Sequence, residues 1–273
     1  MNAYPQPETF VLERGGAWLT IWLDRPQARN ALSARMAEEL AATARTLRAD
    51  RDLRGITFRG RGGIFCAGGD IRDFQNILSG GASHGDVATF SRRAGELFHL
   101  IRELPQVTVM LVEGAAVAGG LGLACAGDFV VATADAQFAL TETMLGIPPA
   151  QIAPLVVERV GPSAARRVML AGARLDGTEA HRIGLVDELA VDAAELTARE
   201  ATIRAGVLRC APGANAETKR LVAAATQLDR QAMMDMAADS FARCLLGPEG
   251  QEGVTAFLEK RKPSWAVDGG EKA

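Results

Sequence analysis

The chain has 273 residues, and 30 Lys and Arg against 33 Asp and Glu give it a net charge of −3 at pH 7. Apolar residues make up 48% and charged residues 23%, which excludes a disordered or fibrous protein. The near-neutral charge argues against nucleic acid as a partner, and no apolar run approaches the roughly 18 residues that a membrane-spanning helix needs.

Strand and helix patterns alternate up to about residue 190, after which only helical patterns follow. Alternating apolar residues around the Gly15-Gly16 pair predict a β-hairpin. The helical spacing of Leu32, Met36 and Leu40 predicts a helix that Ser33 caps. We expect an α/β core over residues 1–190, a helical region over 191–265 and a tail over 266–273.

The expected elements follow in chain order. They are a hairpin over 9–23, a helix over 33–49, a strand over 55–59, a glycine-rich loop over 61–70, an irregular and mobile segment over 74–83, a helix over 86–103, a strand over 107–112, a helix of small residues ending at 127, strands over 129–132 and 137–139, helices from 151 interrupted at 161–162 and 172, a short strand over 185–187, and helices separated at 212 and 247–248.

Two glycine-rich segments follow buried strands, at Phe65–Asp70 and Val117–Gly122. Glycine lets backbone N–H groups approach a ligand closely, because no Cβ stands in the way. The second segment opens a helix, whose free N–H groups favour a developing negative charge. Two such groups converging on one oxygen would form an oxyanion hole, although tight turns and close packing explain the spacing equally well.

No cofactor or metal is expected. Gly120–Cys125 reads G-x-G-x-x-C with Glu142 twenty residues beyond Gly122, but a Cys in third place and a mid-chain position disfavour a dinucleotide site. The spacing of the four cysteines fits no zinc pattern, and the three histidines are scattered. Free thiols, and a start without a signal-peptide pattern, predict a cytoplasmic protein.

Six segments, in register over about 250 residues, resemble the crotonase superfamily of enoyl-CoA hydratases and isomerases. Each segment alone is a weak signal, and their common order makes the resemblance strong. The segments are Arg25–Leu32 (R-P-x-x-x-N-A-L), Phe65–Ile71 (F-x-A-G-x-D-I), Gly114–Asp128, Ala136–Pro148, Arg174–Val186 and Phe257–Pro263.

The resemblance implies an α/β fold with a ClpP-like spiral of ββα repeats and a C-terminal helical region that assembles trimers. The substrate would be an acyl-CoA thioester, and the protein would work as a homotrimer or a dimer of trimers. The coenzyme A carried by the substrate would make any further cofactor unnecessary.

The same resemblance implies the roles of individual residues. The backbone N–H groups of Gly69 and Gly119 would hold the thioester oxygen, where loss of one such bond typically costs ~3–4 kcal/mol of barrier. Glu142 would act as the general acid and base. Residues at positions that contact coenzyme A are Ala28, Arg29, Ala31, Ala67, Gly68, Asp70 and Ile71, with Phe257 and Lys260 reaching a neighbouring subunit's coenzyme A.

One departure from the family pattern concerns the catalytic centre. Hydratases with two glutamates carry the first of them three residues after the second oxyanion glycine, and Gly122 occupies that position here. The chain therefore resembles the single-glutamate members. A single carboxylate can still activate water and pass a proton to Cα, or move a proton between Cα and Cγ.

A second departure is Pro148–Pro154, which replaces the usual P-G-x-G-G segment. This segment, with Arg209–Ala216 and Glu249–Gly253, resembles the isohexenylglutaconyl-CoA hydratases of acyclic terpene degradation. That subgroup implies a branched substrate of the isohexenylglutaconyl or methylglutaconyl type with a free carboxylate.

Three functions remain open from the sequence. The first is an enoyl-CoA hydratase, a lyase that adds water to a branched 2-enoyl-CoA through Glu142. The second is a Δ3,Δ2-enoyl-CoA isomerase that uses the same glutamate, which Gly122 favours. The third is a non-catalytic acyl-CoA-binding protein.

Overall fold

Two β-sheets form the framework of the chain in a computed structural model that describes residue 4 and residues 6–266. The larger sheet has the order β1-β2-β3-β4-β6-β9, antiparallel between β1 and β2 and parallel elsewhere, and the smaller one has the order β5-β7-β8. The strands are β1 Phe10–Gly15, β2 Trp18–Leu23, β3 Gly55–Gly60, β4 Val107–Val112, β5 Ala115–Val117, β6 Phe129–Thr133, β7 Gln137–Ala139, β8 Arg174–Leu175 and β9 Glu188–Ala190.

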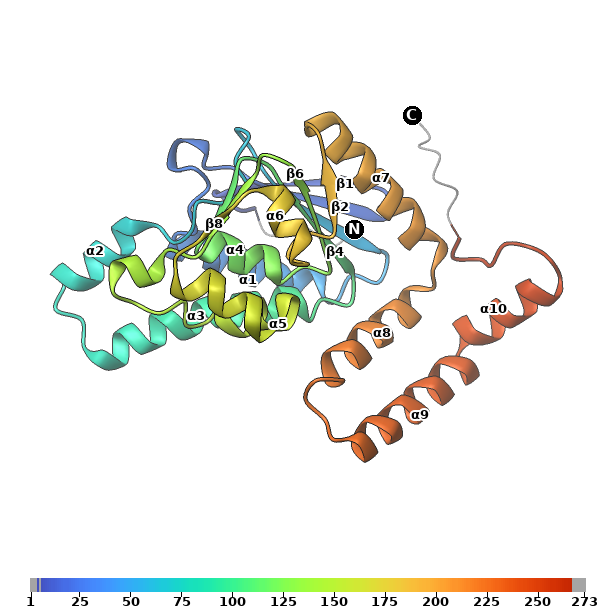
Figure 1. Cartoon of the computed structure of the whole chain (residues 1–273). Coiled ribbons are helices and arrows are strands. Elements are labelled where there is room, and N and C mark those ends of the chain that lie inside the picture. Colours follow the sequence, from blue (N-terminus) through green and yellow to red (C-terminus); the bar gives the residue numbers. More distant parts are fainter. Residues whose placement is uncertain (1–3, 5, 267–273) are drawn as a thin grey trace.

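Ten α-helices and two 3-10 helices lie in the described part of the chain (Figure 1). They are η1 Pro26–Ala28, α1 Ala34–Leu47, α2 Ile71–Ser79, α3 His84–Arg102, α4 Gly119–Cys125, η2 Glu142–Leu145, α5 Ala153–Leu170, α6 Gly177–Arg182, α7 Ala193–Arg209, α8 Pro212–Ala224, α9 Arg230–Leu246 and α10 Pro248–Leu258. No helix among these residues is both long enough and apolar enough to cross a bilayer.

Both faces of β4, a central strand of the larger sheet, are buried. Its residues alternate between two apolar clusters, because successive side chains of a strand point to opposite faces. Val107, Val109 and Leu111 join a cluster that includes residues of α7, whereas Met110 and Val112 join the main core with residues of α1, α3, α4 and α5. The main core thus holds α4 in place against β5 of the smaller sheet.

Most of the predicted elements are confirmed. The hairpin forms, with Gly16 in the left-handed region, and the Ser33 side chain caps α1 by accepting a hydrogen bond from the Met36 amide. The helix expected from Asp86 begins at His84, after a capping box between Ser83 and Asp86. The helical stretch after residue 151 bends at Gly161, as predicted.

Two predictions about local structure are wrong. Residues 74–83 were expected to be irregular, but residues 71–79 form α2, because the Asp70 side chain accepts a hydrogen bond from the Arg72 amide and caps the helix. The strand expected over 185–187 begins only at Glu188, since the amides of Leu185 and Val186 instead bond to the carbonyl of Ala180.

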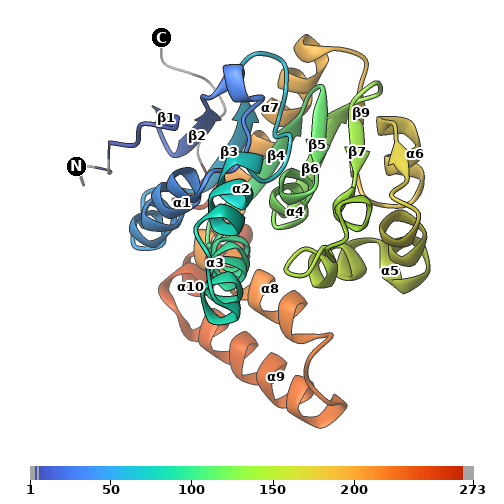
Figure 2. The ribbon, with the colours of Figure 1, turned by 90° about the vertical axis from the view of Figure 1, so that its left-hand side faces the viewer.

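Helices α8, α9 and α10 form an arm that extends away from the two sheets (Figures 1 and 2). Within the arm, α9 packs against α8 and α10. The arm lies in the helical region expected over 191–265. Residues 267–273 of the expected tail lie outside the described residues.

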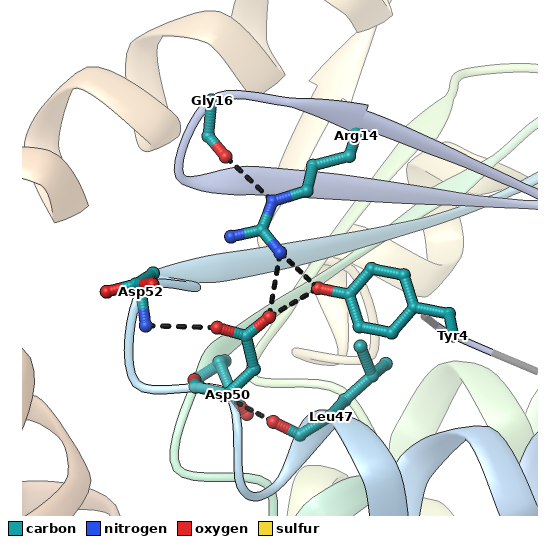
Figure 3. Close-up of polar contacts among 7 residues, drawn as sticks. Tyr4, Arg14, Gly16, Leu47, Asp50 and Asp52 are labelled. Carbon is teal, nitrogen blue, oxygen red and sulfur yellow. Dashed lines mark hydrogen bonds and ion pairs between the residues drawn. The ribbon is translucent and has the colours of Figure 1, made fainter. Parts of the chain in front are cut away.

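Tyr4 is bound to the core through Arg14 and Asp50 (Figure 3). The Asp50 carboxylate accepts hydrogen bonds from the Tyr4 hydroxyl and, at 2.8 Å, from the Arg14 guanidinium. Burial and the hydrogen bond to Asp50 raise the pKa of Tyr4 to about 12. These contacts join Tyr4 to β1 and to the turn after α1.

Candidate active site

The first glycine loop, residues 65–70, lies between the segment after β2 and strand β5. Leu32 pairs with Gly69 in a parallel bridge, in which the Leu32 amide donates to the Gly68 carbonyl at 2.7 Å and the Asp70 amide donates to the Leu32 carbonyl at 3.0 Å. In such a bridge the N–H of Gly69 itself points away from Leu32. The fold therefore leaves this amide available to a ligand.

The second glycine loop brings Gly119 beside Gly69. Gly119 is the first residue of α4, so its amide has no acceptor within the helix. A Cβ placed on Gly119 would lie 3.5 Å from the amide nitrogen of Gly69. Among the described residues, neither amide donates a hydrogen bond. The structure thus brings together the two glycines predicted to form an oxyanion hole.

Close backbone contact makes this approach possible. Gly68 has φ +105°, and a Cβ there would lie 2.9 Å from the Cβ of Ala118 and 3.0 Å from the Val117 carbonyl oxygen. Ala118 itself has φ +49° although it is not a glycine. A strained backbone at this point is typical of functional sites, where the surrounding structure holds it in place.

Glu142 reaches the same edge of the smaller sheet. Strands β5 and β7 are parallel, with Val117 opposite Ala139, so Gly119 and Glu142 both follow the carboxyl ends of neighbouring strands. Glu142 is only 9% exposed, and its Oε2 has no hydrogen-bond partner among the described residues. Burial raises the pKa of Glu142, against hydrogen bonds from the backbone amides of Glu142 and Thr141.

Residues predicted to contact coenzyme A gather beside the first glycine loop. Ala28 ends η1, Arg29 is exposed with φ +52°, and Ala31 is half-buried. The Ala67 amide donates to the Arg29 carbonyl at 3.0 Å, which draws this segment alongside Ala67 and Gly68. Ile71, the first residue of α2, is exposed.

Asp70 has structural partners of its own. Its carboxylate pairs with Arg25 at 2.9 Å, and this hydrogen bond lowers the pKa of Asp70. Arg25 also donates to the Ala31 carbonyl at 2.6 Å. Arg25 therefore ties the segment before α1 to the glycine loop, and Asp70 holds the first turn of α2.

Phe257 and Lys260 are not brought to these loops within one chain. They lie at the end of α10, which packs against α9 at the far end of the molecule from α2 (Figure 1). Phe257 is 82% exposed, and Lys260 has φ +54°. A role at the coenzyme A site would require a second chain.

Two supporting residues went unrecognised in the sequence. Asn30 is fully buried with φ +54°, donates to the carbonyls of Arg61 and Ile64, and accepts from the Arg25 amide. The ring of Phe74 would lie 3.2 Å from a Cβ on Gly69, and it packs edge to face on Phe90 at 5.9 Å. The N of R-P-x-x-x-N was a usable signal for Asn30, whereas Phe74 lay in the segment expected to be irregular.

Cys66 lies inside the first glycine loop but has no feature of a nucleophile. It is fully buried, and burial raises the pKa of its thiol to about 11. The described residues include no group of three or more His, Cys, Asp or Glu that could hold a metal ion. Two free backbone N–H groups and one buried carboxylate are the chemical groups of this site. They can stabilise an oxyanion and transfer a proton beside it.

Comparisons with known proteins point to one family. The model of the family described as enoyl-CoA hydratase/isomerase matches residues 13–268. The human enoyl-CoA hydratase domain-containing protein 2, mitochondrial, is 34% identical over 90% of this chain and 84% of its own length. The crotonyl-CoA hydratase of Syntrophomonas wolfei is 30% identical over 94% of this chain and 98% of its own.

Solved structures are similar over almost the whole chain. Pseudomonas aeruginosa AtuE superimposes with a TM-score of 0.92 at 47% identity, covering 95% of this chain and 100% of that one. An enoyl-CoA hydratase/isomerase from Marinobacter aquaeolei gives a TM-score of 0.91 at 41% identity, with coverage of 95% and 100%.

Proposed function

The chain belongs to the enoyl-CoA hydratase/isomerase family, and from this premise we propose that it adds water across the 2,3 double bond of an acyl-CoA thioester. The observation that carries the proposal is the unpartnered carboxylate oxygen of Glu142 at the sheet edge where Gly69 and Gly119 meet. A buried carboxylate without a partner is costly to keep, and catalysis is a function that retains such groups.

The proposed reaction uses these groups as follows. Glu142 takes a proton from water while the water oxygen bonds to Cβ of the substrate, and the electrons of the double bond move onto the thioester oxygen. The N–H groups of Gly69 and Gly119 stabilise the resulting enolate. Glu142 then returns the proton to Cα, which restores the thioester carbonyl and completes the addition of one water.

Replacing the proposed acid and base tests this function. Glu142→Gln keeps the shape of the side chain but cannot exchange a proton, so hydration should fall by about 10²- to 10⁴-fold. Glu113→Gln is the matched control, since Glu113 is a partly buried carboxylate that pairs with Arg59 outside the site. Full hydratase activity in Glu142→Gln would rule out this role.

We propose a branched acyl group, of the isohexenylglutaconyl or methylglutaconyl type that the subgroup resemblance implies. Apolar side chains beside the site support it: Phe74 and Phe90 pack together next to Gly69, and Ile71 and Leu78 lie exposed on α2. A panel of crotonyl-, 3-methylglutaconyl- and isohexenylglutaconyl-CoA tests the choice. Preference for crotonyl-CoA would contradict it.

Isomerisation is the second candidate, and Gly122 is the observation that favours it. One carboxylate can remove a proton from Cα of a 3-enoyl thioester and return it at Cγ, with the same enolate between the two steps. Incubation of 3-hexenoyl-CoA in heavy water separates the two functions. A shifted double bond without added water indicates isomerase, and a hydrated product indicates hydratase.

We also propose that the enzyme is a homotrimer or a dimer of trimers, in which Phe257 and Lys260 approach a neighbour's coenzyme A. Large apolar side chains exposed on the arm support this assembly: Phe241, Leu246, Phe257 and Leu258. Light scattering after size exclusion should give three or six times the mass of the chain. A monomer would contradict the proposal.

Two further expectations stay proposals. Activity should need no cofactor beyond the coenzyme A of the substrate, so exhaustive dialysis against a chelator should leave hydration unchanged. A cytoplasmic location is supported by the four cysteines, which are all free thiols.

A further inference from the structure

The surroundings of Gly122 leave no room for a side chain. A Cβ on Gly122 would lie 2.9 Å from Cγ1 of Ile152 and 3.1 Å from two ring carbons of Phe98. Both neighbours are buried, with 7% of Ile152 and 3% of Phe98 exposed. The contact is therefore made inside a packed region, where side chains have little freedom to move aside.

Gly122 lies on the same side of α4 as Gly119. It follows Gly119 by three residues in α4, and residues three apart lie on the same face of a helix. Ile152 and Phe98 thus form an apolar wall one helical turn beyond the proposed oxyanion hole. The three heavy atoms nearest to a Cβ on Gly122 are all carbon atoms of these two side chains.

Ile152, one side of this wall, is held in place by the residue before it, Gln151. Gln151 lies over Gly95 of α3, where a Cβ would be 2.3 Å from its Oε1, and its Nε2 donates to the Ser91 hydroxyl at 3.2 Å. Gln151 therefore packs on Gly95 of α3, and Ile152 packs on Gly122 of α4. This double contact, at the segment that replaces P-G-x-G-G, keeps Ile152 from swinging away from Gly122.

We propose that Ile152 and Phe98 are specificity-determining residues that make this site a one-carboxylate centre. They fill the space into which a second acid–base side chain at position 122 would project. The inference rests on the proposed hydratase function. Its consequence is that the proton taken from water and the proton given to Cα both pass through Glu142.

A stability cycle tests the packing without any use of activity. Alanine is more favourable than glycine inside a helix, so Gly122→Ala would stabilise the protein if the space beside it were open. We expect it instead to lower Tm by roughly 4 °C or more, because overpacking a core is destabilising. Ile152→Ala destabilises the protein on its own account, but in that background the same Gly122→Ala change should cost at most half as much.

The matched control for this cycle is Ile203→Ala. Ile203 is as buried as Ile152, at 8% exposed, but it lies on α7 in the other apolar cluster. Its effect should simply add to that of Gly122→Ala. If the Tm changes of Ile152→Ala and Gly122→Ala also simply add, the two residues are not in contact and the inference is overturned.

The pH dependence of kcat/KM tests the functional half. A single carboxylate that must be ionised gives one rising limb across about pH 5 to 9, whereas a pair with one member protonated gives a bell. We expect the pH profile of kcat/KM to have one rising limb for the wild type. The double variant Gly122→Glu with Ile152→Gly should show an additional falling limb. A bell-shaped profile in the wild type would overturn the inference even if that double variant fails to fold.

The two proposals fail in different ways. If the wild type hydrates no enoyl-CoA, the proposed function is wrong. The Tm values of the Gly122→Ala and Ile152→Ala variants still decide whether Ile152 fills the space beside Gly122. If the wild type is active but Gly122→Glu alone keeps the wild-type Tm, the space is open and only the inference fails.

Discussion

At Glu142, burial opposes the charge that catalysis requires. Ionised, the carboxylate has an oxygen without a partner among the described residues, and burial raises its pKa above the ordinary range for glutamate. The protonated form therefore contributes stability that is fully present below the pKa of the unfolded chain. That stability is lost as pH rises through the raised pKa of the folded state.

Glu142→Gln should separate stability from activity. The amide resembles the protonated acid, so the variant should match the wild type in Tm at acid pH. At pH 8 it should exceed the wild type by ~2 °C, corresponding to ~1 kcal/mol. Calorimetry at both pH values measures the difference. An equal or lower Tm at pH 8 would mean that the ionised carboxylate is not destabilising.

Asp50 behaves in the opposite sense. Burial works to raise its pKa, but hydrogen bonds from Tyr4 and Arg14 outweigh burial, and the pKa is lowered (Figure 3). The ionised form thus contributes stability that is present above the unfolded pKa and lost as pH falls through the folded pKa.

Asp50→Asn should lower the free energy of unfolding by about 1–2 kcal/mol at pH 7, since two hydrogen bonds lose their charged acceptor. The difference from the wild type should shrink as the pH is lowered towards the reduced pKa of Asp50. Urea unfolding across this range provides the measurement. Asp52→Asn, at an exposed neighbouring carboxylate, is the control and should show no such trend.

Among the elements, α2 shows most clearly what the sequence could and could not predict. Long strands and helices were predictable from their periodicity, whereas β5, with three residues, and β8, with two, are too short to have one. Helix α2 has apolar residues at helical spacing, Ile71, Phe74 and Leu78, although none of its residues is buried. It is held by contacts far apart in sequence, including the Ala34 amide donating to Asp73 at 2.7 Å.

The candidate site divides in the same way. Gly69, Gly119 and Glu142 were named by the register of family segments, and neither periodicity nor composition would have selected them. Phe74 could not be assigned to the site, because its place beside Gly69 depends on how α2 folds back on the loop. Which residues fill the space beside Gly122 depends equally on the packing of α3 against the start of α5.

Asp73→Ala should loosen α2 while leaving the fold intact. Loss of the hydrogen bond from the Ala34 amide, which ties α2 to the start of α1, costs ~1 kcal/mol, so amide hydrogen exchange over residues 71–79 should accelerate by about fivefold. Ser83→Ala, which removes the cap of α3 instead, is the control and should affect the first turn of that helix. Unchanged exchange in α2 would show that Asp73 does not hold it.

At the scale of the whole molecule, the crotonase-type α/β fold expected from the resemblance is confirmed by the solved structures. A lysine of α8 attaches the arm to this core. Lys219 of α8 donates to Asp128 at 2.6 Å and to the Gln106 carbonyl at 2.8 Å, and burial lowers the pKa of Lys219. Arg54 bonds to the carbonyls of Cys210, which precedes α8, and of Trp265, which follows α10, as well as to that of Val207 on α7.

Lys219→Met should weaken the attachment of the arm. It leaves the carboxylate of Asp128 with the donors of Thr108 alone, at a cost of about 1–3 kcal/mol in unfolding free energy. The double variant with Asp128→Asn should lose less than the sum of the single losses in urea unfolding. Arg220→Met, at an exposed ion pair on the same helix, should cost under ~0.5 kcal/mol.

The packing of Ile152 against Gly122 also constrains which substitutions this site can accept in evolution. A glutamate at position 122 would collide with Ile152, and a small residue at position 152 would leave a hole beside an unchanged Gly122. Each single substitution is therefore harmful, while the two together are compatible. A change between a one-carboxylate and a two-carboxylate centre at this position should therefore need both substitutions, because either one alone gives a less stable protein.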